Sequence, residues 1–352
     1  MDFRGEQKLS TEKLIKKQIN KSAKNQLKLT KKSTGKWRDY MESKKRRFKS
    51  TDGINTINSV IWYPDENKYS RPVAIVQIVH GMMEHIGRYE GFAEYLNKKG
   101  IMVVGHDHLG HGSSVKSKDD FGYFTKEKQS EHLVDDTYRL TCIMKKKYPD
   151  VPYAVIGHSM GSFIVRRYIS TYPDAVDCAV VMGTGNQADI MLYFGEFMSG
   201  MIRLIHGDRY RSSILDKIVF GPYNRKIKNP IAKNDWITTD ADELKKYNND
   251  EKCQFIFTAN GFKGLFDTIL FVKKKRNIKK IPKDFPVLLI SGAQDPVGGY
   301  GRDVERLYNT YTKYLNDVEL KLYSACRHEL FSSEMRQEAF KDVYEWLMSK
   351  LK

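Results

Sequence analysis

The stretch YAVIGHSMGSFIVRRY, residues 153–168, decides how the rest of the chain is interpreted. An apolar run ends at Gly157, a short segment follows, and a helical pattern begins near Gly161. A short run that is apolar on both faces is typical of a buried strand, so the stretch predicts a strand, a tight turn and a helix. The pattern G-x-S-x-G then places Ser159 on the turn itself.

A serine on such a turn has the setting that a nucleophile needs. Its hydroxyl is weakly nucleophilic unless it is exposed, oriented and paired with a base. Side chains two residues away on either side would collide across the turn, which accounts for Gly157 and Gly161. The helix that begins at Met160 directs N–H groups and the positive end of its dipole toward developing negative charge. We therefore expect Ser159 to be a nucleophile and the Met160 N–H to be an oxyanion donor.

The acid and the base are expected downstream, because α/β sheets with a serine on this turn present the acid and then the histidine later in the chain. His328 lies in YSACRHELFSSE, between the alternating run VELKLY and a final helix. Asp295 follows the apolar run VLLISG, and Pro296 stiffens its loop. A carboxylate there would bind the imidazole Nδ1–H and fix its tautomer. Asp284 and Asp303 are the competing acids, but the first precedes the strand and the second begins a helix.

A second oxyanion donor is expected in the loop after an early strand. The segment VHGMMEH, residues 79–85, directly follows the apolar run VAIVQIV. Gly81 permits close backbone approach, which leaves the Met82 N–H to face the substrate oxygen beside that of Met160. Two preorganised donors of this kind are each worth roughly 10²–10³ in rate.

The order of apolar runs predicts the fold class. Short runs alternate with helical stretches, which favours an α/β fold with a mostly parallel central sheet and helices on both faces. The runs lie at 73–79, 101–107, 153–157, 178–183 and 287–292. Residues 184–265 show helical patterns without a buried strand, so we expect a helical cap inserted between two parts of the core, 51–183 and 266–352. The cap's apolar side chains are expected either to line an acyl channel or to form core; they are Met191, Phe194, Phe197, Met198 and Met201.

The basic charge is concentrated at the N-terminus. Residues 1–50 carry 17 Lys and Arg against 5 Asp and Glu, a net +12 of the +17 of the whole chain. This basic N-terminal extension is expected to be a solvated segment, or an amphipathic arm that contacts an anionic membrane surface transiently. Nucleic acid is not expected as a partner, because the other 302 residues carry only +5.

Cysteine usage indicates the cellular compartment, and one histidine motif raises the question of a metal site. Four cysteines without a CxxC pair, no secretory segment and no apolar run of about 18 residues favour a cytoplasmic protein.

The motif HDHLGH, residues 106–111, resembles the zinc signature of metallo-β-lactamase-type hydrolases, but Gly110 stands where that signature has Asp. Asp107 and His111 are instead expected to hold a glycine-rich loop near the active site. Neither a metal nor a cofactor is expected.

Several segments together resemble a known family. HGMMEHIGRY, DHLGHGSS, GHSMGS, QDPVG and RHELFSSE are similar to segments of the monoacylglycerol lipase and lysophospholipase branch of the α/β-hydrolase superfamily, which is also grouped with serine aminopeptidase-like hydrolases. The resemblance covers roughly residues 52–350 and implies an α/β-hydrolase fold with a cap. It implies the same roles for Ser159, Asp295 and His328, and for the amides of Met82 and Met160. The first 50 residues have no counterpart in it.

These observations predict a serine hydrolase that cleaves small carboxylic esters with apolar acyl chains, of the monoacylglycerol or lysophospholipid type, through an acyl-enzyme. Three alternatives stay open. An acyltransferase or peptidase would use the same three side chains, a zinc hydrolase would depend on metal, and a binding module would act through the basic extension.

Overall fold

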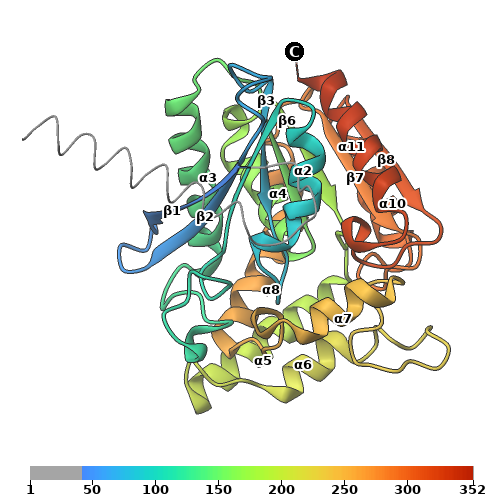
Figure 1. Cartoon of the computed structure of the whole chain (residues 1–352). Coiled ribbons are helices and arrows are strands. Elements are labelled where there is room, and N and C mark those ends of the chain that lie inside the picture. Colours follow the sequence, from blue (N-terminus) through green and yellow to red (C-terminus); the bar gives the residue numbers. More distant parts are fainter. Residues whose placement is uncertain (1–41, 352) are drawn as a thin grey trace, which may run out of the picture. The chain divides into compact units, whose positions relative to one another are not determined.

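The computed structural model describes residues 42–351. They form an eight-stranded sheet in the order β1-β2-β4-β3-β5-β6-β7-β8 (Figure 1). The strands are β1 (Glu42–Lys49), β2 (Thr56–Tyr63), β3 (Ala74–Val79), β4 (Ile101–His106), β5 (Tyr153–His158), β6 (Cys178–Met182), β7 (Val287–Gly292) and β8 (Val318–Tyr323). Strands β3 to β8 run parallel, and β1 and β2 add an antiparallel edge. The predicted α/β fold class is confirmed.

Strand β1 corrects the N-terminal boundary that the sequence suggests. Residues 42–49, with the sequence ESKKRRFK, belong to the expected basic extension but pair with β2 along their whole length. The strand is not recognisable in the sequence, because an edge strand needs little apolar alternation. Its charged side chains keep the exposed edge from pairing with other chains. Residues 1–41 of the extension lie outside the described residues.

Helices cover both faces of the sheet, and alternate strand residues explain how. Val76 and Ile78 of β3 pack in one core with α2 (Glu90–Asn97) and α11 (Arg336–Lys350). Ile75 and Val79 point to the opposite core. That second core contains α3 (Gln129–Lys147), α4 (Met160–Thr171), α8 (Ala259–Lys273) and α10 (Arg302–Tyr311). Both faces are buried, which is why the strands are nearly all apolar.

The segment between β6 and β7 contains the expected cap helices. They are α5 (Asp189–His206), α6 (Ser213–Phe220) and α7 (Ala241–Asn249), followed by η4 (Glu251–Cys253), α8 and α9 (Lys275–Ile278). Helices α5, α6 and α7 gather beyond one end of the sheet (Figure 1). The expected cap boundary at residue 265 falls inside α8, which packs on α5 as well as on α3 and α4. The remaining short helices are η1 (Ile86–Tyr89), η2 (Lys118–Asp120), η3 (Pro173–Ala175) and η5 (Leu330–Ser332).

Most of the α5 side chains expected to line a channel or form core are exposed to solvent. Met191, Phe194, Phe197 and Met201 are exposed, and Met198 is half-buried against the core. Helix α5 packs mainly on α8, and it also contacts α6. Over residues 42–351, no helix combines the length and apolar character needed to cross a membrane.

The strand order places two loops side by side. Strand β3 lies between β4 and β5, so the chain leaves β3 toward one neighbour and later returns to its other side. Val79 and Gly157 are register partners near the carboxyl ends of β3 and β5. Ligands of open α/β sheets bind at such a switch point. The loop that carries Met82 and the turn that carries Ser159 therefore start at the same place.

Candidate active site

The turn between β5 and α4 has the strained geometry that the sequence predicts. Ser159 has φ 53° and ψ −120°, a conformation that side-chain-bearing residues rarely adopt. A Cβ on Gly157 would overlap the carbonyl oxygen of Gly161, and a Cβ on Gly161 would overlap the carbonyl oxygens of Val79 and His80. Both glycines are thus required for the turn to pack against the sheet.

The structure brings His328 and Asp295 together. The His328 Nδ1 lies 3.0 Å from Asp295 Oδ2, and Asp295 is fully buried. The Val297 N–H donates to the other carboxylate oxygen at 2.8 Å, which fixes the carboxylate plane. With Nδ1–H donating to Asp295, the lone pair of His328 is on Nε2. The competing acids do not bind His328: Asp284 is exposed, and Asp303 pairs with an arginine.

The loop after β3 and the start of α4 both lie near Ser159. A Cβ on Gly81 would stand 2.9 Å from the Ser159 Cβ, so the loop after β3 approaches the turn closely. Met160 is the first residue of α4, and its N–H has no acceptor within the helix. Among the hydrogen bonds of residues 42–351, none engages the Met82 N–H. Met83, the next residue, has φ 53°, so this loop is strained as well.

These groups share one cavity of about 410 Å³. Ser159, His328, Met82 and Met160 all contribute to its wall, and Met191 is the one predicted channel residue that does. Most of the remaining wall is apolar. It includes Phe163, Leu192, Val219, Phe220, Leu265, Phe266 and Ile269. The volume suits a small molecule with an apolar part.

A buried ionic network surrounds the site, and sequence reasoning missed it. Glu84 accepts from Gly81 N–H and lies 2.9 Å from His158 Nδ1. Arg88 lies 3.3 Å from Glu84 and binds Glu329 through two contacts of 2.5 and 2.7 Å. The network therefore ties the loop after β3, the residue before Ser159 and the residue after His328 to one another.

The charges of this network stabilise one another. Burial alone would raise the pKa of Glu84, but His158 and Arg88 outweigh it and lower that pKa to about 2. Burial would lower the pKa of His158, yet Glu84 raises it above its usual value. The Glu84 carboxylate therefore favours the protonated form of His158, the residue directly before Ser159. The sequence signal was the i,i+4 spacing of Glu84 and Arg88 just after the glycine loop.

The cap supplies two further neighbours that the sequence did not reveal. Tyr247 of α7 donates a hydrogen bond to the Met83 carbonyl at 3.1 Å. The Trp236 ring lies 5.0 Å from the His328 ring, centroid to centroid. The cap thus contacts both the strained loop and the base. Trp236 lies before α7 and Tyr247 lies within it, and no motif there identifies the role of either residue.

In the HDHLGH motif, Asp107 joins neighbouring loops, whereas the His111 ring hydrogen-bonds, within residues 42–351, only to the Leu109 carbonyl through Nδ1. His106, His108 and His111 are buried, and among the described residues their donor atoms do not converge as a metal site requires. Asp107 accepts from the N–H groups of Ile86 and Ser113 at 2.9 and 2.7 Å, so it joins the loops that follow β3 and β4. Burial lowers the pKa of His106 to about 3 and that of His111 to about 4.

We expect the stability of the fold to fall steeply between about pH 6.5 and pH 4. His106 and His111 take up protons near pH 6.5 in the unfolded chain but only at about pH 3 and pH 4 in the folded one, so acid favours unfolding. One such histidine costs about 1.4 kcal/mol of unfolding free energy per pH unit within its window. The low pKa of Glu84 acts in the same direction below pH 4.5. Urea unfolding at a series of pH values measures the effect.

His106→Phe is the sharpest variant for this test, since neither ring nitrogen of His106 has a hydrogen-bond partner within the described chain. An aromatic ring there removes a buried polar group without orphaning another, so we expect it to be neutral or stabilising at pH 7. It should also make the pH dependence shallower. His206→Phe, at an exposed position of α5, is the matched control and should leave the slope unchanged. Equal slopes for both variants would contradict the assignment to buried histidines.

Known proteins resemble this chain over most of its length. A family model described as Serine aminopeptidase, S33, matches residues 70–335. A monoglyceride lipase homolog of monkeypox virus is 27% identical over 305 residues, which cover 85% of this chain and 98% of that protein. A monoacylglycerol lipase of Mycolicibacterium smegmatis is 26% identical over 316 residues, 88% of this chain and all of the relative. The crystal structure of a thermostable carboxyl esterase from Bacillus coagulans, in complex with glycerol, is 26% identical, with a TM-score of 0.81 over 88% of this chain and 99% of the esterase.

Proposed function

Because this serine ester hydrolase belongs to the serine aminopeptidase S33 family of α/β-hydrolases, we propose that it cleaves monoacylglycerols through an acyl-enzyme formed on Ser159. One observation carries the proposal: Ser159, the His328–Asp295 pair and the amides of Met82 and Met160 meet at a single, mostly apolar cavity. Such a set contains the nucleophile, base, orienting acid and oxyanion donors that acyl transfer needs.

In the proposed mechanism, His328 Nε2 takes the hydroxyl proton of Ser159 as Oγ attacks the acyl carbon. The N–H groups of Met82 and Met160 donate to the oxyanion, and Asp295 stabilises the imidazolium. The imidazolium then protonates the leaving glycerol oxygen, and the acyl chain stays on Ser159. Water attacks this ester with His328 again as base, and the fatty acid leaves with regeneration of the serine hydroxyl.

The cavity wall supports an uncharged head group. Each of its carboxylates has a cationic partner: Glu84 and Glu329 bind Arg88, and Asp303 binds Arg306. A phosphate would have to compete with these ion pairs, whereas glycerol hydroxyls need only hydrogen bonds. The names of the viral and mycobacterial relatives agree with this choice.

We further propose that the enzyme takes its substrate from a lipid surface. Met191 of α5 and Ile218 of α6 line the cavity and are also 60% and 39% exposed, so the cavity reaches an exposed apolar face. That face continues along both cap helices through Ile190, Phe194, Phe197, Leu204, Ile205 and Ile214. A contiguous exposed apolar face of this kind suits contact with lipid. Attraction of the basic residues 1–41 to anionic lipid would add to this contact.

A substrate panel tests the proposed function. We expect monoacylglycerols of medium or long chain to be cleaved faster than lysophospholipids of the same chain, by roughly tenfold or more, because the head group must not disturb paired charges. Hydrolysis should also be faster when the substrate is presented in anionic vesicles than when it is dispersed. Phe194→Ser combined with Phe197→Ser should remove this gain and leave hydrolysis of soluble p-nitrophenyl butyrate unchanged.

The same panel separates the alternatives. An aminoacyl amide tests the peptidase activity that the family description suggests, and an added acceptor alcohol tests acyl transfer. Preference for either of these over water-mediated ester cleavage would replace the proposed reaction. Equal rates on lysophospholipids and monoacylglycerols would contradict the proposed head group while leaving the mechanism standing.

A further inference from the structure

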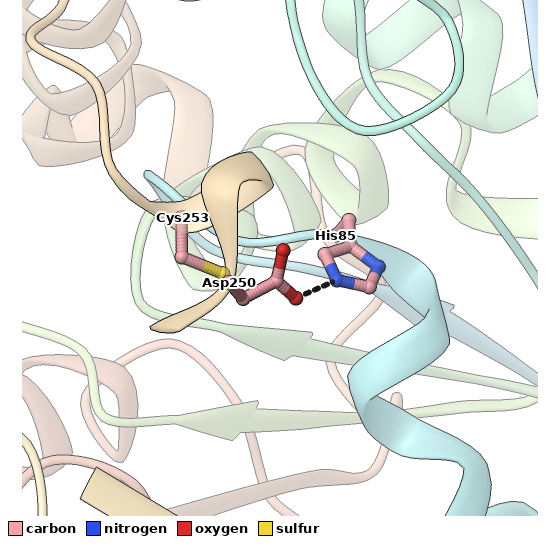
Figure 2. Close-up of side chains that lie close together, drawn as sticks. All are labelled: His85, Asp250 and Cys253. Atoms are coloured by element: carbon pink, nitrogen blue, oxygen red, sulfur yellow. Dashed lines mark hydrogen bonds and ion pairs between the residues drawn. The ribbon is translucent and has the colours of Figure 1, made fainter. Parts of the chain in front are cut away.

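Three side chains with metal-binding atoms lie together beside the active site, outside the groups that the proposed mechanism uses. They are His85, directly after the loop that carries Met82, and Asp250 and Cys253 of the cap (Figure 2). We propose that these three side chains bind a divalent transition ion of the zinc class, which links the cap to the loop after β3.

The geometry brings the donor atoms close to the arrangement that zinc requires. One ligand atom from each side chain lies within 4.8 Å of the other two. Ligand atoms on one tetrahedral zinc are about 3.3 to 3.6 Å apart, as follows from bond lengths of about 2.0 to 2.3 Å. His85 Nε2 and Asp250 Oδ2 are 2.8 Å apart and need to separate slightly to share one ion.

The backbone already holds two of the ligands in position. The Cys253 N–H donates to the Asp250 carbonyl at 2.8 Å, so the turn of η4 presents both side chains toward His85 (Figure 2). The Lys252 N–H donates to Asp250 Oδ1 at 2.9 Å and leaves Oδ2 for the ion. This pre-formed turn lowers the entropy that binding must overcome.

The donor set selects the class of ion. One imidazole, one carboxylate and one thiolate are ligands that Zn²⁺ accepts, whereas Mg²⁺ and Ca²⁺ prefer oxygen alone. Cys253 is buried, and His85 and Asp250 are partly exposed, so an ion can enter from solvent and keep a water as its fourth ligand. Protein would surround the ion on the side of Cys253, and solvent would reach it on the side of His85 and Asp250.

Binding has a definite proton balance. Gly87 N–H donates to His85 Nδ1 at 3.2 Å, so the ring proton is on Nε2 before the ion binds. That proton moves to Nδ1, which costs the weak bond to Gly87, and the Cys253 thiol proton passes to the buffer. Burial raises the pKa of this thiol, so the ion must displace a firmly held proton. The metal–sulfur bond compensates for this cost.

The proposed metal site joins the cap segment of α7 and η4 to the loop after β3, and these two elements are already in contact. Tyr247, from the helix before η4, holds the Met83 carbonyl, two residues before His85. A bound ion would add a second link between the same cap segment and the same loop. We therefore expect Zn²⁺ to raise the unfolding temperature of the full chain.

Cobalt substitution tests the site directly. Co²⁺ added to the purified, tag-free full chain should give a thiolate-to-cobalt charge-transfer band that saturates at one equivalent, and Zn²⁺ should displace it. Cys253→Ser should abolish the band, and His85→Gln should weaken binding by roughly 100-fold, the loss of one ligand bond. His85→Gln retains a donor toward Asp250, so it keeps the test valid if Cys253→Ser misfolds.

Cys142→Ser is the matched control, because Cys142 is the exposed cysteine of α3 and lies outside the cluster. It should retain both the band and the rise in unfolding temperature with Zn²⁺. Mg²⁺ and Ca²⁺ should produce neither signal. A band that survives in Cys253→Ser or disappears in Cys142→Ser would overturn the proposal, as would the absence of any band in the unmodified chain.

Discussion

Ser159→Ala is expected to lower kcat for p-nitrophenyl ester hydrolysis by roughly 10⁶-fold, with little change in stability. The hydroxyl is the atom that attacks the acyl carbon in the proposed mechanism, so its removal leaves only the binding groups and the oxyanion amides. Alanine at position 159 keeps the backbone strain of φ 53° without adding bulk. Initial rates under saturating substrate, with circular dichroism as a check of folding, measure the effect.

Ser170→Ala is the matched control for this variant. Ser170 lies near the other end of α4, and its hydroxyl donates to the Arg167 carbonyl within the helix. We expect its rate to stay within about twofold of the original, as for a change away from the site. If Ser159→Ala kept more than a hundredth of the activity, another nucleophile or a metal-bound water would have to replace the serine.

The second large effect is expected for Asp295→Asn, which should lower kcat by roughly 10⁴-fold. The carboxylate accepts from His328 Nδ1–H and stabilises the imidazolium as it forms. An amide carries no charge, and its NH₂ group can turn toward Nδ1 and favour the wrong tautomer. Full kinetic curves should show the loss in kcat rather than in KM, because Asp295 does not contact the acyl chain in the proposed mechanism.

Asp284→Asn provides the comparison for Asp295→Asn. Asp284 lies before the same strand, β7, but is exposed and accepts a hydrogen bond from Asn316. Its replacement should leave kcat within about twofold, as a surface change does. A larger loss in Asp284→Asn than in Asp295→Asn would reverse the choice of acid that the sequence order and the structure both favour.

The sequence predicts those parts of the fold in which burial produces a recognisable run of apolar residues along the chain. Strands β3 to β7 are covered on both faces, so each is a short, nearly continuous apolar run. The placement of Ser159, Asp295 and His328 also follows from order along the chain, because each lies just after a strand. Their roles stay predictions until the variants above are measured.

The edge strand and the cap helices leave a weaker apolar pattern in the sequence than the central strands do. Strand β1 is exposed and rich in Lys and Arg, so its composition is that of a solvated segment. Phe194 and Phe197 have the spacing of core or channel residues, yet both are exposed. Sequence spacing shows that a helix has an apolar side, but not whether protein, ligand or solvent covers it.

Buried charges are the features that sequence reasoning missed most completely. Glu84, Arg88 and Glu329 are charged residues of the kind usually found on surfaces. Glu84 and Arg88 lie 245 and 241 positions before Glu329 along the chain, so nothing local shows that these two residues meet Glu329. Only the fold brings the loops after β3 and β8 together. The cluster of His85, Asp250 and Cys253 was hidden for the same reason.

The most direct test of the central claim is the reaction of the full chain with a labelled fluorophosphonate, followed by mass spectrometry of the digested protein. The reaction is run in the presence of a chelator, so that the outcome does not depend on any bound ion. We expect one phosphonyl adduct per chain, located on Ser159, with loss of ester hydrolysis in proportion to labelling. An adduct on another residue, or undiminished hydrolysis by fully labelled protein, would contradict Ser159 as the nucleophile.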